Sequence, residues 1–183
     1  AAGMCNEIRK YIPEFKININ ISYVQLIKSD ILNDMLSVIQ KHSLPPEAIS
    51  IELTESGYLD ATPRFWKLRN KLKEYGIQFI IDDFGTGYSN LHCLSDMNPD
   101  YIKIDKNFTA KAMRNMFDHE LLTKVIDMAH SINIKISIEG VEKRETFDII
   151  KKEHVDYIQG YLFGKPCEKK KFIGKYIIMG GIK

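Results

Sequence analysis

The stretch Phe79-Ile80-Ile81-Asp82-Asp83-Phe84-Gly85-Thr86-Gly87-Tyr88-Ser89 decides the fold, because it joins a short apolar run to two adjacent carboxylates and a glycine-rich loop. An apolar run of this length, rich in β-branched residues and stopped by glycine, predicts a buried strand. We expect this strand to cover residues 77–82. The alternative is a helix N-cap followed by a turn, since Asp and Gly favour both structures.

The two aspartates point to a cation site only under one condition. Adjacent side chains on a strand lie on opposite faces, so Asp82 and Asp83 can serve one site only where the strand frays at its C-terminal end. Two neighbouring carboxylates repel each other unless positive charge lies between them, and a divalent cation can supply that charge. The remaining strands decide between a cation site and a simple turn.

The composition excludes several classes of protein. A chain of 183 residues fits one domain, and 44% hydrophobic with 27% charged residues is typical of a soluble globular protein. The formal charge of +2 gives no attraction to nucleic acid polymers or membranes, and the basic runs at 151–152 and 169–171 are interpreted as solvated helix faces. No run approaches the roughly 18 apolar residues of a membrane span. We therefore expect no nucleic acid polymer and no membrane contact for this segment.

The cysteines and the opening residues bear on compartment and completeness. Cys5, Cys93 and Cys167 are scattered and odd in number, which favours free thiols in a reducing cytoplasm over disulfides or zinc. Residues 1–12 resemble the middle of an amphipathic helix without a capping residue before it. We expect residues 1–14 to be the remnant of a preceding helix, in a chain cut from something longer whose parent could be membrane-anchored.

Strand and helix patterns alternate along the whole chain. Besides 77–82, period-two or apolar runs predict strands at 16–21, 49–53, 101–105, 134–139 and 155–160. Helical patterns predict helices at 24–40, near 63–75, within 117–132, near 143–153 and from 168 to about 178, with a short helix or turn at 89–97. This alternation predicts an α/β fold with parallel strands joined by crossover helices.

Polar side chains lie at or near the C-terminal ends of these predicted strands. They are Asn20, Glu52, Asp82, Asp83, Lys103, Asp105, Glu139 and Gln159. In a (β/α) barrel those strand ends form one mouth, where active sites lie. A single polar strand end has the simpler explanation of a helix cap, but six in succession favour a functional site.

The residue types at this mouth favour hard-cation chemistry. Carboxylates, amides and one lysine are present without histidine, and oxygen ligands suit Mg²⁺ or Mn²⁺ better than zinc or copper. Two cations about 3.5–4 Å apart that bridge an attacking water suit phosphodiester hydrolysis. Lys103 would orient that water or stabilise the developing anion.

Six segments resemble the EAL domain family, in the family's order and covering the chain from Phe15 onward. They are Asn20-Ile21-Ser22, Glu52-Leu53-Thr54-Glu55-Ser56, Asp82 to Ser89, Lys103-Ile104-Asp105, Glu139-Gly140-Val141-Glu142 and Gln159 to Pro166. The resemblance implies a modified TIM (β/α)8 barrel that hydrolyses the bacterial second messenger cyclic di-GMP to linear pGpG with Mg²⁺ or Mn²⁺.

The resemblance also implies a role for each metal-binding residue. Asn20, Glu52 and Asp82 would bind the first metal, and Asp83 would help to hold the second. Glu139 would be a metal ligand or the general base that acts on the attacking water.

The remaining site residues would orient substrate, water and loop. By resemblance, Lys103 would contact the attacking water and Gln159 would complete the substrate pocket. Glu55 would anchor the glycine-rich loop, which couples the site to dimerisation in the family, and a loop with two glycines needs such an outside anchor. Asp105 would support the ligands without touching the metal.

The sequence departs from the family in one important respect. The glutamate of the Glu-Ala-Leu motif is a family metal ligand, and this chain contains no such motif. We therefore expect residues 1–183 to form a single but partial EAL-type barrel domain, an incomplete barrel that lacks its first strands. We expect it to be marginally stable, or closed by dimerisation or by exchange with another copy, with weak or absent hydrolysis.

Other functions stay open at this point. The main alternative to a phosphodiesterase is a non-catalytic cyclic di-GMP receptor or protein-interaction module. A different metal-dependent barrel enzyme would explain the acidic strand ends but not the segment from Gln159 to Pro166. Sensor or GGDEF domains would accompany this segment in its parent protein.

Overall fold

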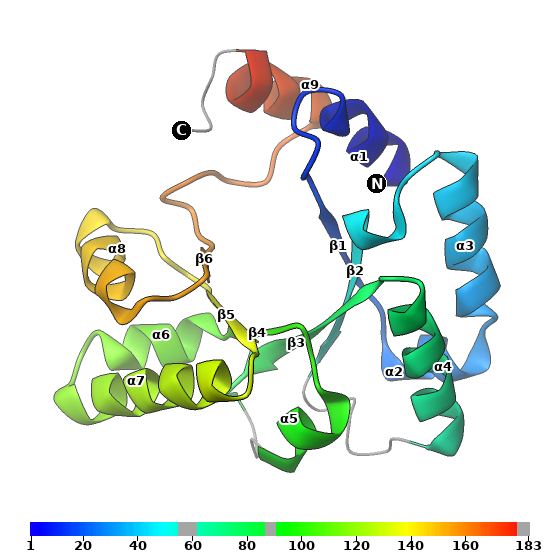
Figure 1. Cartoon of the computed structure of the whole chain (residues 1–183). Helices are drawn as coiled ribbons and strands as arrows, with labels where there is room; N and C mark the ends of the chain where they lie inside the picture. The colour runs from blue at the N-terminus through cyan, green and yellow to red at the C-terminus, as the bar shows by residue number, and fades with distance from the viewer. Residues whose placement is uncertain (55–61, 87–90, 179–183) are drawn as a thin grey trace. The chain divides into compact units, whose positions relative to one another are not determined.

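The structure, a computed structural model, describes residues 1–54, 62–86 and 91–178, the side chains of 91–93 and 178 excepted. Helices and strands alternate through these residues (Figure 1). The strands are β1 Ile17–Asn20, β2 Ile49–Thr54, β3 Gln78–Phe84, β4 Tyr101–Ile104, β5 Lys135–Ile138 and β6 Tyr157–Ile158.

The described helices differ widely in length. They are α1 Ala2–Arg9, α2 Tyr23–Lys28, α3 Ile31–Lys41, α4 Pro63–Glu74, α5 Leu91–Met97, α6 Lys106–Ala112, α7 Met116–Ser131, α8 Arg144–Ile150 and α9 Lys169–Phe172, with shorter turns η1 Pro46–Ala48, η3 Lys151–Glu153 and the π-helix η4 Ile173–Ile178. Within the described segments, no helix is both long and apolar enough to cross a membrane.

The strand order identifies the type of α/β fold. The described strands form one six-stranded sheet in the order β1-β2-β3-β4-β5-β6, which is also their order in the chain. A doubly wound sheet reverses its order at a switch point, whereas a TIM barrel adds each strand beside the last. The pairs β3–β4, β4–β5 and β5–β6 are parallel. The predicted α/β fold with parallel strands and crossover helices is thus confirmed, and six consecutive strands correspond to an incomplete TIM barrel.

The chain divides into two compact units. The first unit comprises Ala1–Ile51, Thr62–Gln78 and Pro166–Lys183, and the second comprises Glu52–Ala61 and Phe79–Lys165. The prediction of a single domain stays a prediction.

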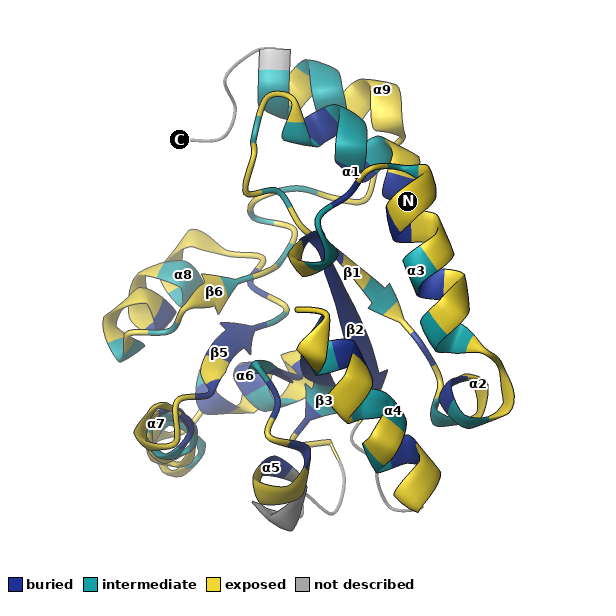
Figure 2. Cartoon of the chain, turned by 45° about the vertical axis from the view of Figure 1, so that its right-hand side comes forward, coloured by how far each residue is buried: buried dark blue, intermediate teal, exposed yellow. Residues whose placement is uncertain are grey.

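The first unit is held together by contacts between its N-terminal and C-terminal segments and by a helical layer. Lys169 forms an ion pair with Glu7, and the ring of Phe172 meets that of Phe15 edge-on at 6.1 Å. In the helical layer, the Tyr23 ring packs 5.5 Å from the fully buried Phe65. Helices α3 and α4 each bury apolar residues on one side, as their alternating buried and exposed colours show in Figure 2.

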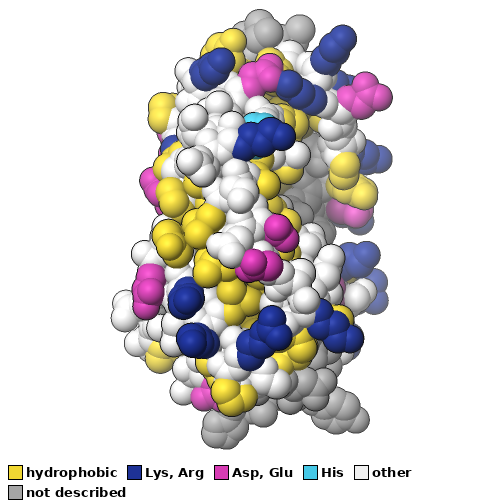
Figure 3. All heavy atoms as spheres, turned by 90° about the vertical axis from the view of Figure 1, so that its right-hand side faces the viewer, with side chains coloured by type: hydrophobic (Ala, Val, Ile, Leu, Met, Phe, Trp, Pro, Cys, Tyr) yellow, Lys and Arg dark blue, Asp and Glu magenta, His cyan; other side chains and the backbone are white. Residues whose placement is uncertain are grey.

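One face of the first unit carries a small basic groove. Figure 3 shows basic and hydrophobic side chains interspersed on this side of the molecule. The groove between α2, α3 and α4 is lined by Leu26, Ile31, Leu68 and three cations, Arg64, Lys67 and Lys71, among others. Its volume of about 180 Å³ is below the range of roughly 300–1,000 Å³ that is typical of ligand pockets. We assign no ligand to it.

The second unit contains the strands that carry most of the candidate site. Ile80, Ile102 and Ile136 are fully buried in β3, β4 and β5. Register pairs such as Lys103 with Ser137 align β4 and β5, so their C-terminal ends lie at one edge. Figure 2 shows β5 in the buried colour along most of its length, as expected for a parallel strand covered on both faces.

The structure corrects several predicted boundaries. The helix predicted at 24–40 is two helices, because Ser29 and Asp30 interrupt it and Asp30 precedes a new N-terminus. Helix α6 was not predicted at all, and the strand expected at 155–160 is only Tyr157–Ile158. The predicted strand at 77–82 continues to Phe84, so the helix N-cap alternative for its aspartates is wrong.

Candidate functional site

The centre of the candidate site is the ammonium group of Lys103. This side chain is buried and lies at the C-terminal end of β4. Its Nζ atom is 2.7 Å from Glu139 Oε1, 3.0 Å from Asp82 Oδ1 and 3.2 Å from Glu52 Oε1. All four residues belong to the second unit, so the strand-end acids of β2, β3 and β5 do meet around one cation.

A β-bulge brings both aspartates of β3 to this point. Ile81 pairs with Ile102 and Phe84 with Ile104, so three steps along β3 match two along β4. Asp83 has φ +55°, a left-handed conformation that is uncommon for a residue other than glycine. The sequence predicts that the strand frays at Asp82, but in the structure the strand continues past this residue. The extra residue, rather than an unpaired end, removes the strict alternation of faces.

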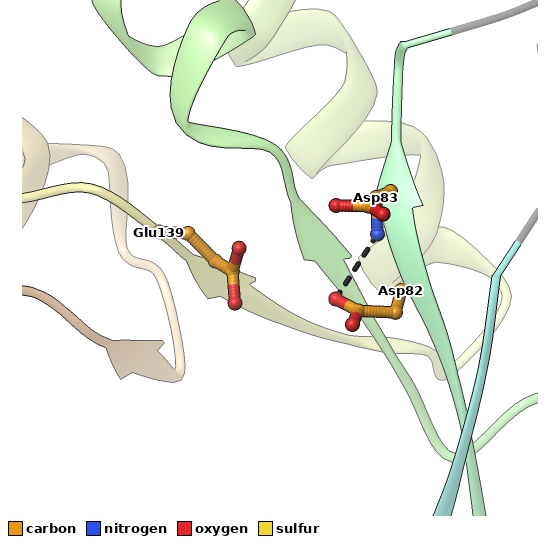
Figure 4. Close-up of side chains that lie close together, drawn as sticks. All are labelled: Asp82, Asp83 and Glu139. Carbon is orange, nitrogen blue, oxygen red and sulfur yellow. Dashed lines mark hydrogen bonds between the residues drawn. The ribbon is translucent and has the colours of Figure 1, made fainter. Parts of the chain in front are cut away.

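Three carboxylates at the mouth lie close enough to share a cation. One oxygen atom from each of Asp82, Asp83 and Glu139 lies within 4.8 Å of the other two. Figure 4 shows their carboxylate groups pointing toward one another, two from β3 and one from the end of β5. The Asp83 N–H donates a hydrogen bond of 3.0 Å to Asp82 Oδ1, which fixes the Asp82 carboxylate relative to the turn.

The site carries more negative charge than its own cation neutralises. Burial raises the pKa of Asp83, and the charges of Asp82 and Asp105 raise it further. Burial also raises the pKa of Glu139, and the nearby Lys103 offsets this only in part. Burial alone would lower the pKa of Lys103, but its hydrogen bonds to Glu139 and Asp82 and the charge of Glu52 raise it. Lys103 is therefore firmly charged, while Asp83 and Glu139 ionise less readily than usual.

This donor set fits hard divalent cations. The convergent groups are carboxylate oxygens, and the excess negative charge favours positive charge in addition to Lys103. Asp82, Asp83 and Glu139 supply the clustered ligand atoms, and Glu52 reaches the same ammonium group. Among the described residues, this cluster contains no histidine or cysteine, which would favour zinc.

Two predicted site residues lie at strand ends without a described contact to Lys103. Asn20 ends β1 in the first unit, so its role as a metal ligand stays a prediction. Gln159 follows β6, where its N–H donates to Ile138 O at 2.8 Å and its carbonyl accepts from Val141 at 3.1 Å. These bonds fix its backbone beside the Glu139 segment, and its substrate role stays a prediction.

The two predicted supporting residues have different outcomes. Asp105 is buried, and its Oδ1 accepts from the Asn107 N–H at 2.7 Å, which caps α6. This cap was missed from the sequence, although an aspartate directly before Lys106-Asn107 is a usual capping signal. Glu55, the predicted loop anchor, lies outside the described residues, as does the loop segment 87–90.

Comparisons with known proteins identify the family of this chain. The model of the EAL domain matches residues 2–166. The cyclic di-GMP phosphodiesterase PdeL of Escherichia coli is 29% identical over 181 residues, which are 98% of this chain and 50% of PdeL. The chain spans half or less of the length of the first curated relatives that it matches.

Solved structures share the fold. The EAL enzyme Bd1971, bound to cAMP and cyclic di-GMP, superposes with a TM-score of 0.90 at 29% identity and covers 95% of this chain and 48% of its own. Klebsiella pneumoniae BlrP1, in complex with manganese and cyclic di-GMP, has a TM-score of 0.84 at 25% identity, covering 92% of this chain and 42% of its own. A calcium complex of BlrP1 is also similar. The incomplete TIM barrel is thus confirmed, and the chain belongs to the EAL domain family.

Proposed function

We propose that this segment forms part of a phosphodiesterase that hydrolyses cyclic di-GMP to linear pGpG with Mg²⁺ or Mn²⁺. The observation that carries the proposal is the convergence of Asp82, Asp83 and Glu139 within 4.8 Å beside Lys103. The similarity to PdeL, named a cyclic di-GMP phosphodiesterase, supports the substrate. The calcium and manganese complexes of BlrP1 with cyclic di-GMP support the use of divalent cations.

The bound cations would neutralise the phosphate and lower the pKa of an attacking water. Glu52, Asp82, Asp83 and Glu139, with Asn20 from β1, are the proposed ligands. Glu139 is also the proposed general base, because its raised pKa brings a carboxylate closer to the range in which it accepts a proton usefully.

The other site residues would position the substrate and the water. Lys103 donates to Glu139 and Asp82, and it would orient the water or stabilise the charge that develops on the phosphate. Gln159 would contact the substrate, Glu55 would hold the glycine-rich loop, and Asp105 would support the site through α6.

Manganese binding tests the site directly. Asp82→Asn removes one charged ligand, so we expect it to weaken Mn²⁺ binding to the full chain at least tenfold. A tenfold loss of affinity is the lower limit for replacing a residue that only supports a metal ligand. Asp100→Asn is the matched control, because it makes the same chemical change at the opposite end of the strands, where Asp100 Oδ2 accepts from the Phe79 N–H. Isothermal titration calorimetry measures both affinities, and equal losses would contradict the proposal.

Turnover and ligand binding separate the enzyme from the receptor alternative. Because the chain contains no Glu-Ala-Leu glutamate, we expect it to bind cyclic di-GMP but to release little pGpG. Chromatography of the nucleotides after incubation with Mg²⁺ or Mn²⁺ measures the release of pGpG. A longer chain that supplies the missing glutamate should restore turnover. Binding without turnover in that longer chain would favour a non-catalytic receptor.

We also propose a homodimer formed through α7. Met116 is 79% and Phe117 78% exposed at the start of this helix, with Leu121 one turn further on at 45%. Such a row of exposed apolar side chains is typical of an interface. Sedimentation of the full chain should show a dimer that Phe117→Asp dissociates, whereas a monomer at every concentration would contradict it.

The compartment is part of the same proposal. Cys5 and Cys167 are free thiols, which supports a reducing cytoplasm for this function. Sensor or GGDEF domains in a longer parent chain would supply its input.

A further inference from the structure

The loops that follow the site carboxylates both pack against the first turn of α6. After Asp83, Gly85 has φ +94°, and a Cβ atom there would lie 2.7 Å from Cδ1 of Phe108. After Glu139, Gly140 has φ +74°, and a Cβ atom there would lie 2.5 Å from the Cβ of Lys106. Each loop therefore reaches its position only because glycine leaves room for a residue of α6.

Backbone hydrogen bonds also link the C-terminal ends of β3, β4 and β5. The Asp105 N–H donates to Phe84 O at 3.2 Å, and the Glu139 N–H donates to Ile104 O at 3.1 Å. The Asp105 side chain in turn caps α6 through the Asn107 N–H. The start of α6 is thus hydrogen-bonded, directly or through one residue, to the ends of both β3 and β5.

The turn after Asp83 has the conformation that such an outside contact must hold. Asp83 is left-handed, a conformation that carries a steric cost in a residue other than glycine and that contacts from its surroundings help to hold. Within the turn, the Thr86 hydroxyl and N–H donate to Asp83 O at 2.9 and 3.3 Å. The Phe108 ring lies next to Gly85, in the space that a Cβ atom would take.

We infer that the first turn of α6 positions the metal carboxylates, with Phe108 acting through Gly85 on Asp83 and Lys106 acting through Gly140 on Glu139. This inference rests on the proposed metal site. Phe108 and Lys106 are positioning residues, since among the described residues no ion pair or hydrogen bond joins either to Asp82, Asp83 or Glu139, although the charge of Lys106 lowers the pKa of Asp83.

General packing does not account for these two residues. Phe108 is only half-buried and Lys106 is exposed, whereas the buried residues of α6 are Thr109 and Ala112. A change at Phe108 should therefore affect the geometry of the site more than the stability of the core.

Mn²⁺ affinity of the full chain, read by the electron paramagnetic resonance of free Mn²⁺, tests this. Phe108→Ala should weaken binding by about tenfold, as loss of a group that orients metal ligands does. Phe108→Leu, which still fills the space over Gly85, should restore most of the affinity. Leu122→Ala is the matched control, because Leu122 is fully buried on α7 and its loss should lower the melting temperature without changing the affinity. Equal affinity losses in Phe108→Ala and Leu122→Ala would overturn the inference.

A double variant tests the contact itself. Gly85→Ala introduces a Cβ atom against the Phe108 ring and should weaken Mn²⁺ binding. If Phe108 sets the turn, Gly85→Ala with Phe108→Ala should bind Mn²⁺ more tightly than Gly85→Ala alone, because the ring that opposes the new methyl group is gone. Losses that simply add would overturn the route from Phe108 to Asp83.

A measurement without metal separates this inference from the proposed function. The ¹³C chemical shifts of Asp83 and Glu139 report their backbone conformation, so Phe108→Ala should shift Asp83 and Gly140→Ala should shift Glu139. Unchanged shifts would overturn the positioning role whatever the chain does with Mn²⁺. Shifts that change as expected in a chain that binds no Mn²⁺ would support positioning and overturn the proposed metal site instead.

Discussion

Asp83 and Glu139 at one end of the β3–β6 strands and Asp156 at the other have pKa values that are shifted in opposite directions. At the C-terminal ends, the pKa values of Asp83 and Glu139 are raised, first by burial. At the N-terminal ends, Asp156 Oδ2 accepts from the Ile136 N–H at 2.8 Å and lies 3.0 Å from His130 Nε2. Burial alone would raise the pKa of Asp156, but these hydrogen bonds and the neighbouring charges lower it.

The two ends differ in whether several carboxylates gather around one cation. At the mouth, Glu52, Asp82 and Glu139 share the single ammonium of Lys103. At the opposite end, Asp100 and Asp156 each receive a backbone N–H of the neighbouring strand. A carboxylate that accepts an N–H of the neighbouring strand stabilises the fold, whereas carboxylates clustered around one ammonium group retain the capacity to bind a further cation.

The N-terminal ends also repeat a short sequence. Asp100-Tyr101-Ile102 and Asp156-Tyr157-Ile158 open β4 and β6, and both strands pair with β5 between them. The rings of Tyr101 and Tyr157 lie 5.5 Å apart, and Lys135 of β5 is over the Tyr157 ring at 5.9 Å. The same Asp-Tyr-Ile arrangement therefore occurs twice at the N-terminal ends of the strands, where the aspartates stabilise the fold.

Replacing the shared donor should produce the largest difference between the two ends. In metal-free protein, Lys103→Met leaves buried carboxylates without their cation and should lower the free energy of unfolding by about 3–5 kcal/mol. Lys135→Met, at the other end, loses an exposed cation–π contact worth about 0.5–1 kcal/mol and the charge interaction of Lys135 with Asp156. Urea unfolding with EDTA measures both. Added Mn²⁺ should restore much of the loss in Lys103→Met, and similar losses in the two variants would break the comparison.

A medium effect on stability is expected when Asp156, at the N-terminal ends of the strands, is replaced. Asp156→Ala leaves the Ile136 N–H without its acceptor, which should cost about 1–3 kcal/mol of unfolding free energy. Asp148→Ala is the control, since its exposed pair with Arg144 is worth about 0.3–0.5 kcal/mol. Mn²⁺ affinity should be unchanged in both variants. A loss of affinity in Asp156→Ala would show that the two ends do not act separately.

The smallest expected effect is a difference in the sign of pH dependence. Because the folded pKa of Asp156 is lowered, its contribution is present above the unfolded value of about 3.9 and is lost as the pH falls through the folded pKa. The stability deficit of Asp156→Asn should therefore shrink in acid. The folded pKa of Glu139 is raised, so its ionisation destabilises metal-free protein as the pH rises, and Glu139→Gln should gain stability relative to the unmodified chain. Urea unfolding between pH 3 and 7 measures both, and slopes of the same sign would contradict the contrast.

The sequence predicted the strands and the residues at their ends because both depend on residue type. Apolar runs such as the one before Asp82 specify buried strands, and the order of the polar ends specifies a mouth. Helix α6 escaped prediction because Lys106–Ala112 is too short to show a helical period, although Asp105 marks its start. The break at Ser29 and Asp30 escaped because apolar spacing continues across it.

The contacts over Gly85 and Gly140 could not be read from the chain at all. Each joins a glycine to a residue of α6 that is distant in sequence, and only packing brings Phe108 and Lys106 to them. Glycine in the sequence indicates a turn, but it does not say which neighbour needs the space.

The bulge in β3 makes this site sensitive to the deletion of a residue. Between Ile81 and Phe84 the chain is one residue longer than regular pairing with β4 requires. Deleting either aspartate would leave a more regular sheet with an acid still at the strand end, and by sequence it would look like a mild change. The surplus residue is what allows two neighbouring carboxylates to reach one cluster with Glu139. In this strand the ability to form a cation site depends on the number of residues as much as on their types.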